Sequence, residues 1–490
     1  MKDQPRLLFL LPTLGYGGME TRFLTLAEAL RSRGGEATFL AAPGALEGQA
    51  AATARVRRVD WLAEGRASDY DLVERISRGH TAAFVPCDPM LLHVVPALVS
   101  VLPVHLCLHN VPGTFPNWFG ESAWARARAL VSSLHASGRV ALSASSEAQA
   151  REHEQDLGLP AGAVAASPNG VAIRSDDDHI SSGAIRSVAL VTRLAYEKRA
   201  NAAAAAALVA AGLARGCDVV LEVYGEGPDE AAIKSLLAES LPDGAWRLHG
   251  SAARPVDVLR VADVCVGTGR MNVEALVCGR RVVVVKSLDP AGQLGAPVTP
   301  SSFDTVASDN FTWRRRDPLD PDDVWDELEQ LSAEDVAAVR DRARREYSAD
   351  AMLDRDLALL ADLEAVQTPL GEAAARLVSK LGWQSASLED ALTAAHAHGQ
   401  AAERGRQGEE RSRLAETARR EAAEQARSEA ESARSEAERA RSEAERVRAE
   451  AEAAHAAAEQ RYHQLTRTRR YRVGAALARP LDALRRLRRG

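Results

Sequence analysis

Short apolar runs alternate with amphipathic stretches over the first 172 residues of the chain. Residues 19–34 have the periodicity of a helix and follow the first apolar run. Strands separated by helical stretches are typical of parallel βαβ units. The pattern therefore predicts an α/β domain over residues 1–173. Its expected strands are residues 7–14, 36–42, 81–87, 104–110 and 138–145.

The same alternation returns after a polar break. Residues 174–183 (RSDDDHISSG) are acidic and serine-rich and show no periodicity, which predicts an interdomain linker. Residues 184–385 then repeat the pattern, with a strand at 187–191 and an alanine-rich helix over 201–213. We expect two Rossmann-like domains, 1–173 and 184–385, facing each other across a cleft that binds a ligand.

From about residue 386 the composition changes to Ala, Glu and Arg. Residues 427–447 are nearly a literal heptad, RSEAESA RSEAERA RSEAERV, whose alanines have the spacing of a coiled-coil seam. An alanine seam buries little area, and pairs such as Arg427–Glu431 also support a lone solvated helix. Region 386–460 is thus predicted to be a coiled coil that joins copies of this chain, or alternatively a single-helix spacer.

The net charge of −7 conceals an asymmetry. Residues 461–490 contain ten Arg and one Asp, or +9, so residues 1–460 carry −7 − 9 = −16. An acidic body argues against nucleic acid as a partner. The basic tail also carries Tyr, Val and Leu side chains, and this amphipathic character favours an anionic membrane surface. A solvated or helix-packed tail is the alternative.

Cysteine usage and hydropathy limit the compartment. The five cysteines show no C-x-x-C motif or Cys/His cluster, which argues against zinc and disulfide frameworks and favours a reducing cytosol. The opening apolar run is too short for a signal peptide, and no run approaches the ~18 apolar residues of a membrane span. We expect a cytoplasmic protein that is peripheral on the inner face of the cell membrane.

Two cations follow the expected strand 187–191. Arg193 offers a bidentate fork and Lys198 a point charge, the pair that a diphosphate needs to neutralise its charge. Open α/β sheets bind ligands there, outside the carboxyl ends of their strands. Two ordinary surface cations beside Glu197 remain the alternative.

A second group lies in the glycine-rich turn GTGRMNVE, residues 267–274. Arg270, Met271 and Asn272 open a helix whose first N–H groups can hold a phosphate, and Glu274 lies one turn in, where it can accept from ribose hydroxyls. A glutamate that merely favours the helix dipole is the alternative. No metal site is expected among these residues.

Weaker signals come from glycine turns and one histidine. Gly17 and Gly18, in GYGG, precede a helix and would let backbone N–H groups approach an anion, or form an ordinary tight turn. Gly250 follows VYGEGP and closes a second glycine turn, LHG. His109 ends the strand that begins at Val104 and would act near the reacting centre, or be purely structural.

In order and spacing, these segments resemble the retaining, GT-B-fold glycosyltransferases of family 4, in particular bacterial members. The resemblance covers roughly residues 5–310. The matching segments are GYGGME (15–20), His109, SSEAQAR (145–151), SPNGVAI (167–173), TRLAYEK (192–198), VYGEGP (223–228), the glycine of LHG, and GTGRMNVEALVCGRRVVVV (267–285).

The resemblance implies a role for each matched residue. Arg193 and Lys198 would hold the donor diphosphate, Glu274 would bind the ribose, and His109 would approach the donor sugar. Gly18 would lie near the donor phosphate or the acceptor. The reaction would transfer a sugar from a nucleotide sugar to a glycan or lipid-linked glycan, with the anomeric configuration retained, without metal or other cofactor, in bacterial surface polysaccharide assembly.

The sequence departs from the family pattern at one carboxylate. The family's usual pair is Glu-x7-Glu, and the position eight residues before Glu274 is Val266. Thr192 also replaces a common glycine before Arg193. We interpret the missing carboxylate as altered sugar recognition. A catalytically inactive GT-B scaffold that organises a membrane-associated assembly through its coiled coil is the alternative.

Overall fold

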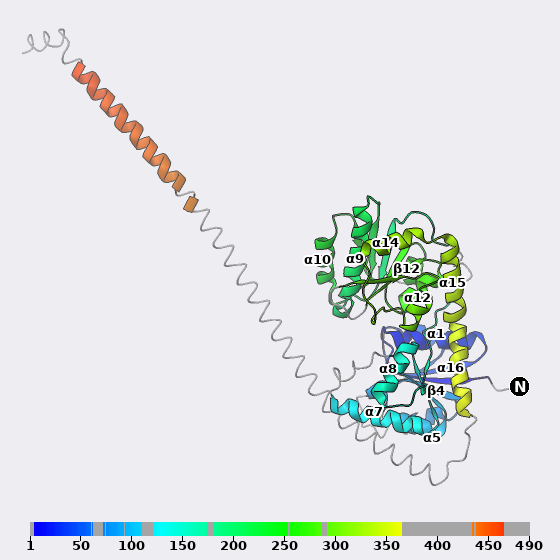
Figure 1. The fold of residues 1–490 in the computed structure, drawn as a ribbon. Coiled ribbons are helices and arrows are strands. Elements are labelled where there is room, and N and C mark those ends of the chain that lie inside the picture. The colour runs from blue at the N-terminus through cyan, green and yellow to red at the C-terminus, as the bar shows by residue number, and fades with distance from the viewer. Residues whose placement is uncertain are drawn as a thin grey trace, which may run out of the picture. The chain divides into compact units, whose positions relative to one another are not determined.

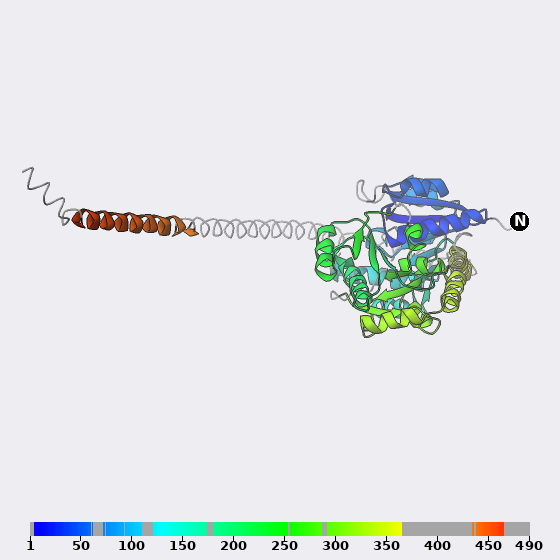
Figure 2. The same cartoon turned by 90° about the horizontal axis from the view of Figure 1, so that it is seen from above.

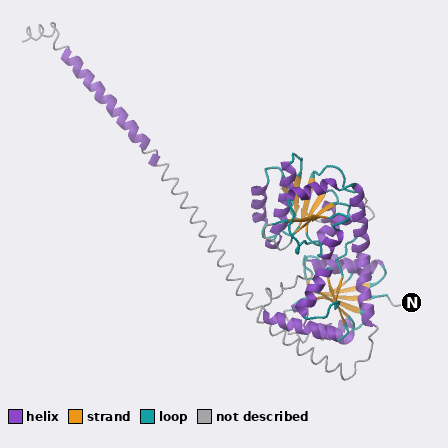
Figure 3. Ribbon diagram, viewed as in Figure 1, coloured by secondary structure: helices purple, strands orange, loops and turns teal. Residues whose placement is uncertain are grey.

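The computed structural model describes residues 4–59, 61, 72–73, 75–92, 94–109, 121–173, 180–252, 255–286, 292–364, 434–435 and 438–464. The chain divides into two units, Met1–Gly399 and Gln400–Gly490, which are described separately. The first unit contains two sheets, each covered by helices on both faces (Figures 1 and 3). The predicted basic C-terminal tail, 461–490, lies largely outside the described residues, as does most of region 386–460.

The N-terminal sheet has seven parallel strands in the order β3-β2-β1-β4-β5-β6-β7. The strands are β1 (Arg6–Thr13), β2 (Glu36–Ala42), β3 (Arg55–Arg58), β4 (Ala82–Pro86), β5 (Val104–Cys107), β6 (Val140–Ala144) and β7 (Val164–Ala166). Helices between them are α1 (Gly18–Ser32), α2 (Glu47–Thr53), α4 (Pro89–Leu92), α5 (Val95–Val101), α7 (Glu121–Ala136) and α8 (Glu147–Leu157).

The C-terminal sheet has six strands in the order β10-β9-β8-β11-β12-β13, with only β13 antiparallel among them. The strands are β8 (Ser187–Val191), β9 (Val220–Tyr224), β10 (Trp246–Leu248), β11 (Val264–Gly267), β12 (Arg281–Val285) and β13 (Leu294–Pro297). Its helices are η1 (Tyr196–Lys198), α9 (Arg199–Ala214), α10 (Glu230–Ser240), α11 (Pro255–Leu259), α12 (Arg270–Val277), α13 (Phe303–Ser308), α14 (Pro321–Gln330) and α15 (Ala333–Tyr347).

Local sequence signals explain several helix ends. The Ser146 side chain accepts from the Gln149 N–H at the start of α8, and Gly158 ends that helix with a φ of 65°. Ser332 and Asp335 form a reciprocal capping box at the start of α15. These caps satisfy backbone groups that a helix end would otherwise leave unpaired.

Both faces of each sheet are buried, as parallel sheets require. Alternate residues of β1 show this: Leu8 and Leu10 belong to one core cluster, while Leu7 and Phe9 belong to the cluster on the other face. In the C-terminal sheet, all five residues of β12 are buried. In the sequence, these strands therefore appear as continuous apolar runs and not as alternating apolar and polar positions.

The helix α16 (Ala349–Glu364) follows α15 and packs against the N-terminal sheet. Its residues Met352, Leu353 and Leu360 lie in the same buried cluster as Phe9 and Phe23. The second half of the chain thus contributes to the cores of both sheets (Figure 1). The domain limits 1–173 and 184–385 stay predictions, and the sequence pattern gave no sign of this return.

In the second unit, residues 438–464 form a straight helix whose described side chains are exposed (Figure 2). Its charges pair along the helix, for example Arg441 with Glu445 at 3.6 Å and Arg448 with Glu452 at 3.0 Å. Such i,i+4 pairs support a helix without a partner. The coiled coil stays a prediction. None of the described helices is both long enough and apolar enough to cross a membrane.

Candidate functional site

The strand order of the C-terminal sheet reverses between β8 and β11. These strands pair in parallel, with Val188 opposite Val264, while β9 and β12 lie on their outer sides. Open α/β sheets bind ligands outside the carboxyl ends of their strands at such a switch point. The two segments that carry the predicted donor residues, 192–198 and 267–274, begin at these two strand ends.

The segment after β8 packs closely against the segment after β9 and is hydrogen-bonded to it. A Cβ atom on Gly225 would overlap the carbonyl oxygen of Thr192, and one on Gly227 would overlap that of Leu194. Only glycine permits so close an approach of two backbones. Three backbone hydrogen bonds complete the junction: Thr192 N to Tyr224 O, Leu194 N to Glu226 O and Asp229 N to Leu194 O, each 3.0 Å.

Arg193 and Lys198 lie in the segment after β8, residues 192–198. Arg193 is exposed, and Lys198 is half-buried at the end of η1. The next residue, Arg199, is held by Asp229 through two hydrogen bonds of 2.8 and 2.9 Å. The backbone that carries the two predicted cations is therefore fixed on both sides, although their binding of a diphosphate stays a prediction.

Gly250 belongs to the same group of loops. Its φ of 69° favours glycine, and its carbonyl accepts from the N–H of Gly225 at 2.7 Å. The Glu226 carboxylate accepts from the N–H of Ser251 at 3.0 Å. The loop after β9 is thus hydrogen-bonded both to the loop after β8 and to the loop after β10. Glu226 was missed by the sequence reasoning, and its position between two glycines was the available signal.

The turn between β11 and α12 depends on Gly269, whose φ is 64°. The Gly269 N–H donates to the Phe311 carbonyl at 3.1 Å, and the buried Asn272 amide donates to the Gly267 carbonyl at 2.9 Å. The Met271 side chain covers Gly267, where an added Cβ would overlap the Met271 methyl group. Asn272 and Met271 therefore shape the turn in this structure, and their contact with a donor stays a prediction.

Arg270 and Glu274 form an ion pair within α12, with Nε 2.8 Å from Oε1. The other two guanidinium nitrogens of Arg270 donate to the Gly170 carbonyl at 2.9 Å and to the Thr25 hydroxyl at 3.2 Å. Gly170 follows β7 and Thr25 lies on α1, so Arg270 connects the two sheets. The carboxylate predicted to bind ribose is thereby tied to the N-terminal sheet.

Gly17 and Gly18 lie at the start of α1, with Gly17 as its N-cap. The Glu20 side chain folds back over Gly17, where a Cβ would overlap its carboxylate. Burial raises the pKa of Glu20, and the charge of Asp88 raises it further. The space beside Gly18 is open, since an added Cβ would meet no described atom within 4 Å. No described atom therefore fills the space beside Gly18, and the approach of a ligand to this helix end stays a prediction.

His109 follows β5 in the N-terminal sheet, and its ring nitrogens are buried. Burial lowers the pKa of His109 well below its usual value, and the nearby Arg22, His105 and His153 lower it further, while Asn169 opposes them. The imidazole is therefore neutral at pH 7 and can take part in hydrogen bonds without adding a positive charge. Its approach to a donor sugar stays a prediction.

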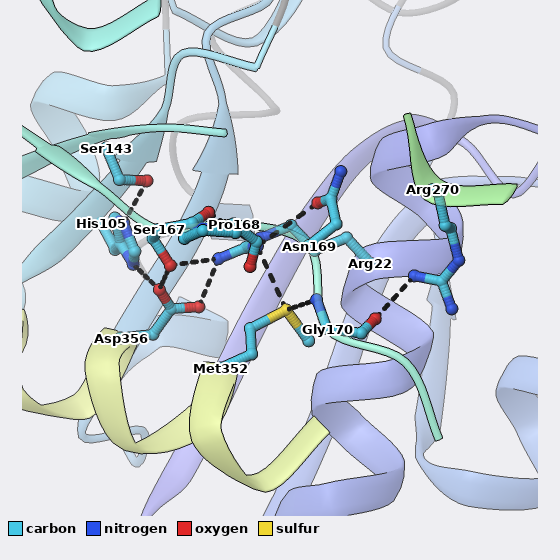
Figure 4. A network of polar contacts seen from close by, with 10 residues as sticks. All are labelled: Arg22, His105, Ser143, Ser167, Pro168, Asn169, Gly170, Arg270, Met352 and Asp356. Atoms are coloured by element: carbon cyan, nitrogen blue, oxygen red, sulfur yellow. Dashed lines mark hydrogen bonds and ion pairs between the residues drawn. The ribbon is translucent and has the colours of Figure 1, made fainter. Parts of the chain in front are cut away.

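A buried polar network lies behind these residues (Figure 4). Arg22 of α1 and Asp356 of α16 form an ion pair at 2.6 Å, with both side chains fully buried. Neither residue is among those predicted from the sequence to form the site. The signal for Arg22 was an arginine on the helix face of Leu26 and Ala29, both buried.

The described residues contain no group of three or more His, Cys, Asp or Glu side chains arranged to hold a metal ion. The predicted site residues instead fall into two groups. Arg193, Lys198, Gly250 and the α12 turn surround the switch point of the C-terminal sheet, whereas Gly17, Gly18 and His109 lie at strand ends of the N-terminal sheet. The groups are linked through Gly170 and Thr25, which both bond to Arg270.

Comparison with solved structures identifies the fold. A glycosyltransferase from Rickettsia africae superposes with a TM-score of 0.52 at 11% identity, covering 74% of this chain and 100% of the other. Anabaena Alr3699/HepE, crystallised with UDP and glucose, gives 0.53 at 17% identity, covering 73% and 99%. The same protein with UDP-glucose gives 0.52 at 17% identity.

No protein-family model matches the sequence, and no curated protein matches it. At 11 to 17% identity the structural likeness establishes the fold alone. The first unit of this chain has the fold of the GT-B glycosyltransferases.

Proposed function

We propose that this protein is a glycosyltransferase that moves a sugar from a nucleotide-sugar donor to a glycan or lipid-linked glycan with retention of anomeric configuration. One observation carries the proposal. The segment with Arg193 and Lys198 and the helix start with Glu274 flank the strand switch of the C-terminal sheet, where ligands of open α/β sheets bind.

Each residue has a defined role in this proposal. Arg193 and Lys198 neutralise the diphosphate as it departs, which is the largest electrostatic demand of the transfer. Glu274 accepts from the ribose hydroxyls. Gly18 leaves room at the start of α1 for the donor phosphate or the acceptor. His109, neutral because it is buried, meets the donor sugar as a hydrogen-bonding group.

The identity of the donor base is open to a direct test. HepE, which shares the fold, was crystallised with UDP and with UDP-glucose. UDP is therefore the first nucleotide to try, followed by the other nucleoside diphosphates. A ligand at 100 times its dissociation constant stabilises the folded state by about 2.7 kcal/mol, which a thermal unfolding experiment detects readily.

The test compares the wild type with Arg193→Ala/Lys198→Ala in thermal unfolding with each nucleotide and in transfer assays. We expect stabilisation by one nucleotide class in the wild type, its loss in the variant, and a turnover reduced by about a hundredfold or more. The control Arg151→Ala/Lys234→Ala removes the same charges from exposed helix positions that pair with Glu147 and Glu230. Equal nucleotide stabilisation in both variants would remove the diphosphate assignment.

The second candidate is a GT-B scaffold without catalysis, and Val266 favours it. Its side chain is fully buried within β11, so the position eight residues before Glu274 lies in the core and offers no carboxylate to a donor sugar. Nucleotide binding without turnover of any nucleotide sugar would favour the scaffold. Turnover of one nucleotide sugar, lost with Arg193 and Lys198, would eliminate it.

The C-terminal regions complete the proposal. Residues 461–490, with ten arginines and one aspartate, dock on an anionic membrane at the cytoplasmic face, where a lipid-linked acceptor of bacterial surface polysaccharide assembly would be available. Region 386–460 spaces the enzyme from that surface or joins copies of the chain. These assignments rest on the charge and heptad patterns of the sequence.

A further inference from the structure

The loop 167–170, which follows β7, is held from one side by the guanidinium of Arg22. Its Nη1 donates to the carbonyls of Ser167 at 3.2 Å and Pro168 at 3.1 Å, and to the Asn169 side chain at 3.3 Å. Arg22 lies on α1, far from this loop in sequence (Figure 4). One fully buried side chain therefore contacts three successive residues, two of them through their backbone carbonyls.

Arg22 is itself fixed by α16. Its Nη2 lies 2.6 Å from the Asp356 carboxylate and 2.9 Å from the Ser167 hydroxyl, and that hydroxyl donates to Asp356 at 2.5 Å. His105 approaches the same carboxylate at 3.9 Å and bonds to Ser143 at 2.7 Å. A buried charge is tolerated only with such partners, because its transfer from water costs several kcal/mol. The fork of Arg22 therefore has a single orientation.

The far end of the loop contacts α16 and, through Arg270, the helix α12 of the C-terminal sheet. The Gly170 N–H donates to the Met352 sulfur at 3.0 Å, and the Gly170 carbonyl accepts from Arg270 at 2.9 Å. A Cβ on Gly170 would lie 2.8 Å from both the Met352 Cβ and the Ser348 carbonyl oxygen, so the loop fits tightly against the start of α16. Arg270 then holds Glu274 at 2.8 Å.

We propose that Arg22 is a positioning residue for Glu274, acting through the loop 167–170 and Arg270; this rests on the proposed role of Glu274 at the donor ribose. Stability alone does not explain the arrangement, because apolar residues of similar volume often stabilise a core as well as a buried ion pair does. A guanidinium fork adds directed hydrogen bonds. The Arg22 guanidinium donates to the carbonyls of Ser167 and Pro168. The same loop carries the Gly170 carbonyl, which accepts from Arg270.

The consequence is geometric. Without the fork, the carbonyls of Ser167 and Pro168 lose their donor and the loop shifts to find others. The Gly170 carbonyl moves with it, and Arg270 follows its acceptor or turns further toward Glu274. A binding group must be held within about 0.5 Å to keep its contacts. The ribose hydroxyls would then lose a correctly placed carboxylate while the diphosphate contacts persist.

The test uses the full chain and two variants at Arg22. Arg22→Lys keeps the charge opposite Asp356 but replaces the planar fork by a point charge. Arg22→Met/Asp356→Leu removes both charges and so avoids an unpaired buried ion. Arg33→Met is the matched control, because Arg33 also joins α1 to α16, through Asp350 at 2.9 Å, without touching the loop. Urea unfolding first establishes that each variant is folded.

The readout is the preference for ribose, measured as the ratio of dissociation constants for 2′-deoxyuridine diphosphate and UDP. We expect Arg22→Lys to lower this ratio about tenfold with the affinity for 2′-deoxyuridine diphosphate unchanged, and Arg33→Met to leave it as in the wild type. Glu274→Gln should lower the ratio equally, and the double variant Arg22→Lys/Glu274→Gln should lower it no further. Such non-additivity is the signature of two residues acting through one contact.

Hydrogen exchange provides a second readout that needs no nucleotide. We expect Arg22→Lys to accelerate exchange in segments 167–173 and 267–277, and Arg33→Met to accelerate neither. Acceleration confined to 167–173, or an unchanged ribose preference in a folded variant, would overturn the positioning role. If the wild type itself fails to prefer UDP, the ribose assignment of Glu274 fails, and exchange in 267–277 still decides whether Arg22 positions this helix.

Discussion

Val266 and Glu274 show how single residues limit the chemistry of this site. Glu274 is partly exposed on α12, whereas the Val266 side chain is fully buried in β11. A carboxylate at Val266 would carry an unpaired charge into a hydrophobic core, at a cost far above that of its binding contacts. Under the proposed function, a donor sugar would be recognised without it, by groups at the loop or by the N-terminal sheet.

The buried His105 makes stability depend on pH. Burial lowers the pKa of His105 to about 4, whereas an unfolded histidine titrates near 6.5. The unfolded chain binds more protons between these values, so the stability contribution is complete above about pH 6.5 and is lost as the pH falls toward about 4. We expect the contribution of His105 to the free energy of unfolding to drop by about 3 kcal/mol over this range.

Urea unfolding at pH 4.5 and 7.5 checks this expectation. His105→Gln should reduce the pH dependence because glutamine can still bond to Ser143 and does not titrate in this range. Some dependence should remain because the pKa of His109 is also lowered by burial. His135→Gln, on α7, is the control and should keep the full dependence. An equal slope in His105→Gln and wild type would contradict the assignment.

At the scale of elements, the candidate site depends on loops that are held in place by hydrogen bonds and close packing with one another. The segment after β8 rests on the two glycines after β9, and these in turn meet the segment after β10. Each loop is short, and none has a hydrophobic core of its own. Their order therefore comes from mutual backbone hydrogen bonds, and a change in one loop should reach the predicted cations in the next.

Gly225→Ala tests this dependence. A Cβ there would overlap the Thr192 carbonyl oxygen, and the φ of 155° is unfavourable for alanine. We expect a loss of about 1–3 kcal/mol in the free energy of unfolding and a weaker affinity for UDP. Gly48→Ala is the control, because Gly48 lies in α2 with open space around it, and alanine should stabilise that helix by about 0.5–1 kcal/mol. Wild-type stability and binding in Gly225→Ala would refute the bracing role.

At the scale of the molecule, contacts among the described residues join the two sheets of the first unit. The helix α16 packs on the N-terminal sheet, Arg270 bonds to Gly170 and Thr25, and Arg314 pairs with Glu152 of α8 at 3.1 Å. Arg315 also pairs with Glu152. Arg270 and the Arg314 pair use exposed or partly exposed polar groups, which can exchange with water. The Arg22–Asp356 pair, which holds α16 to α1, is fully buried and cannot exchange with water in this way.

The basic tail leads to a prediction for the whole chain. The full chain should sediment with phosphatidylglycerol vesicles at least tenfold better than residues 1–460, because each basic residue near an anionic surface contributes about 1 kcal/mol. Phosphatidylcholine vesicles should bind neither, and 0.5 M salt should release the full chain. Both chains should keep equal stabilisation by UDP. Retention of vesicle binding by residues 1–460 would contradict the role of the tail.

The sequence by itself determined the strands and helices that lie around the site. The strand 187–191 was predicted with the bounds that β8 has, and the alanine-rich helix over 201–213 lies within α9. Hydrophobic runs and glycine turns are local signals, since they act on residues that are neighbours along the chain. The positions of Arg193, Lys198 and Glu274 at strand ends followed from these local patterns.

Only the tertiary structure decided which of these strand ends lie next to each other. The adjacency of β8 and β11 depends on strand order, and the pairing of Arg22 with Asp356 joins residues 334 positions apart. The return of α16 to the N-terminal sheet likewise leaves no periodic trace. A buried charge requires a partner, but the sequence does not say which one, because the partner is chosen by packing across the whole fold.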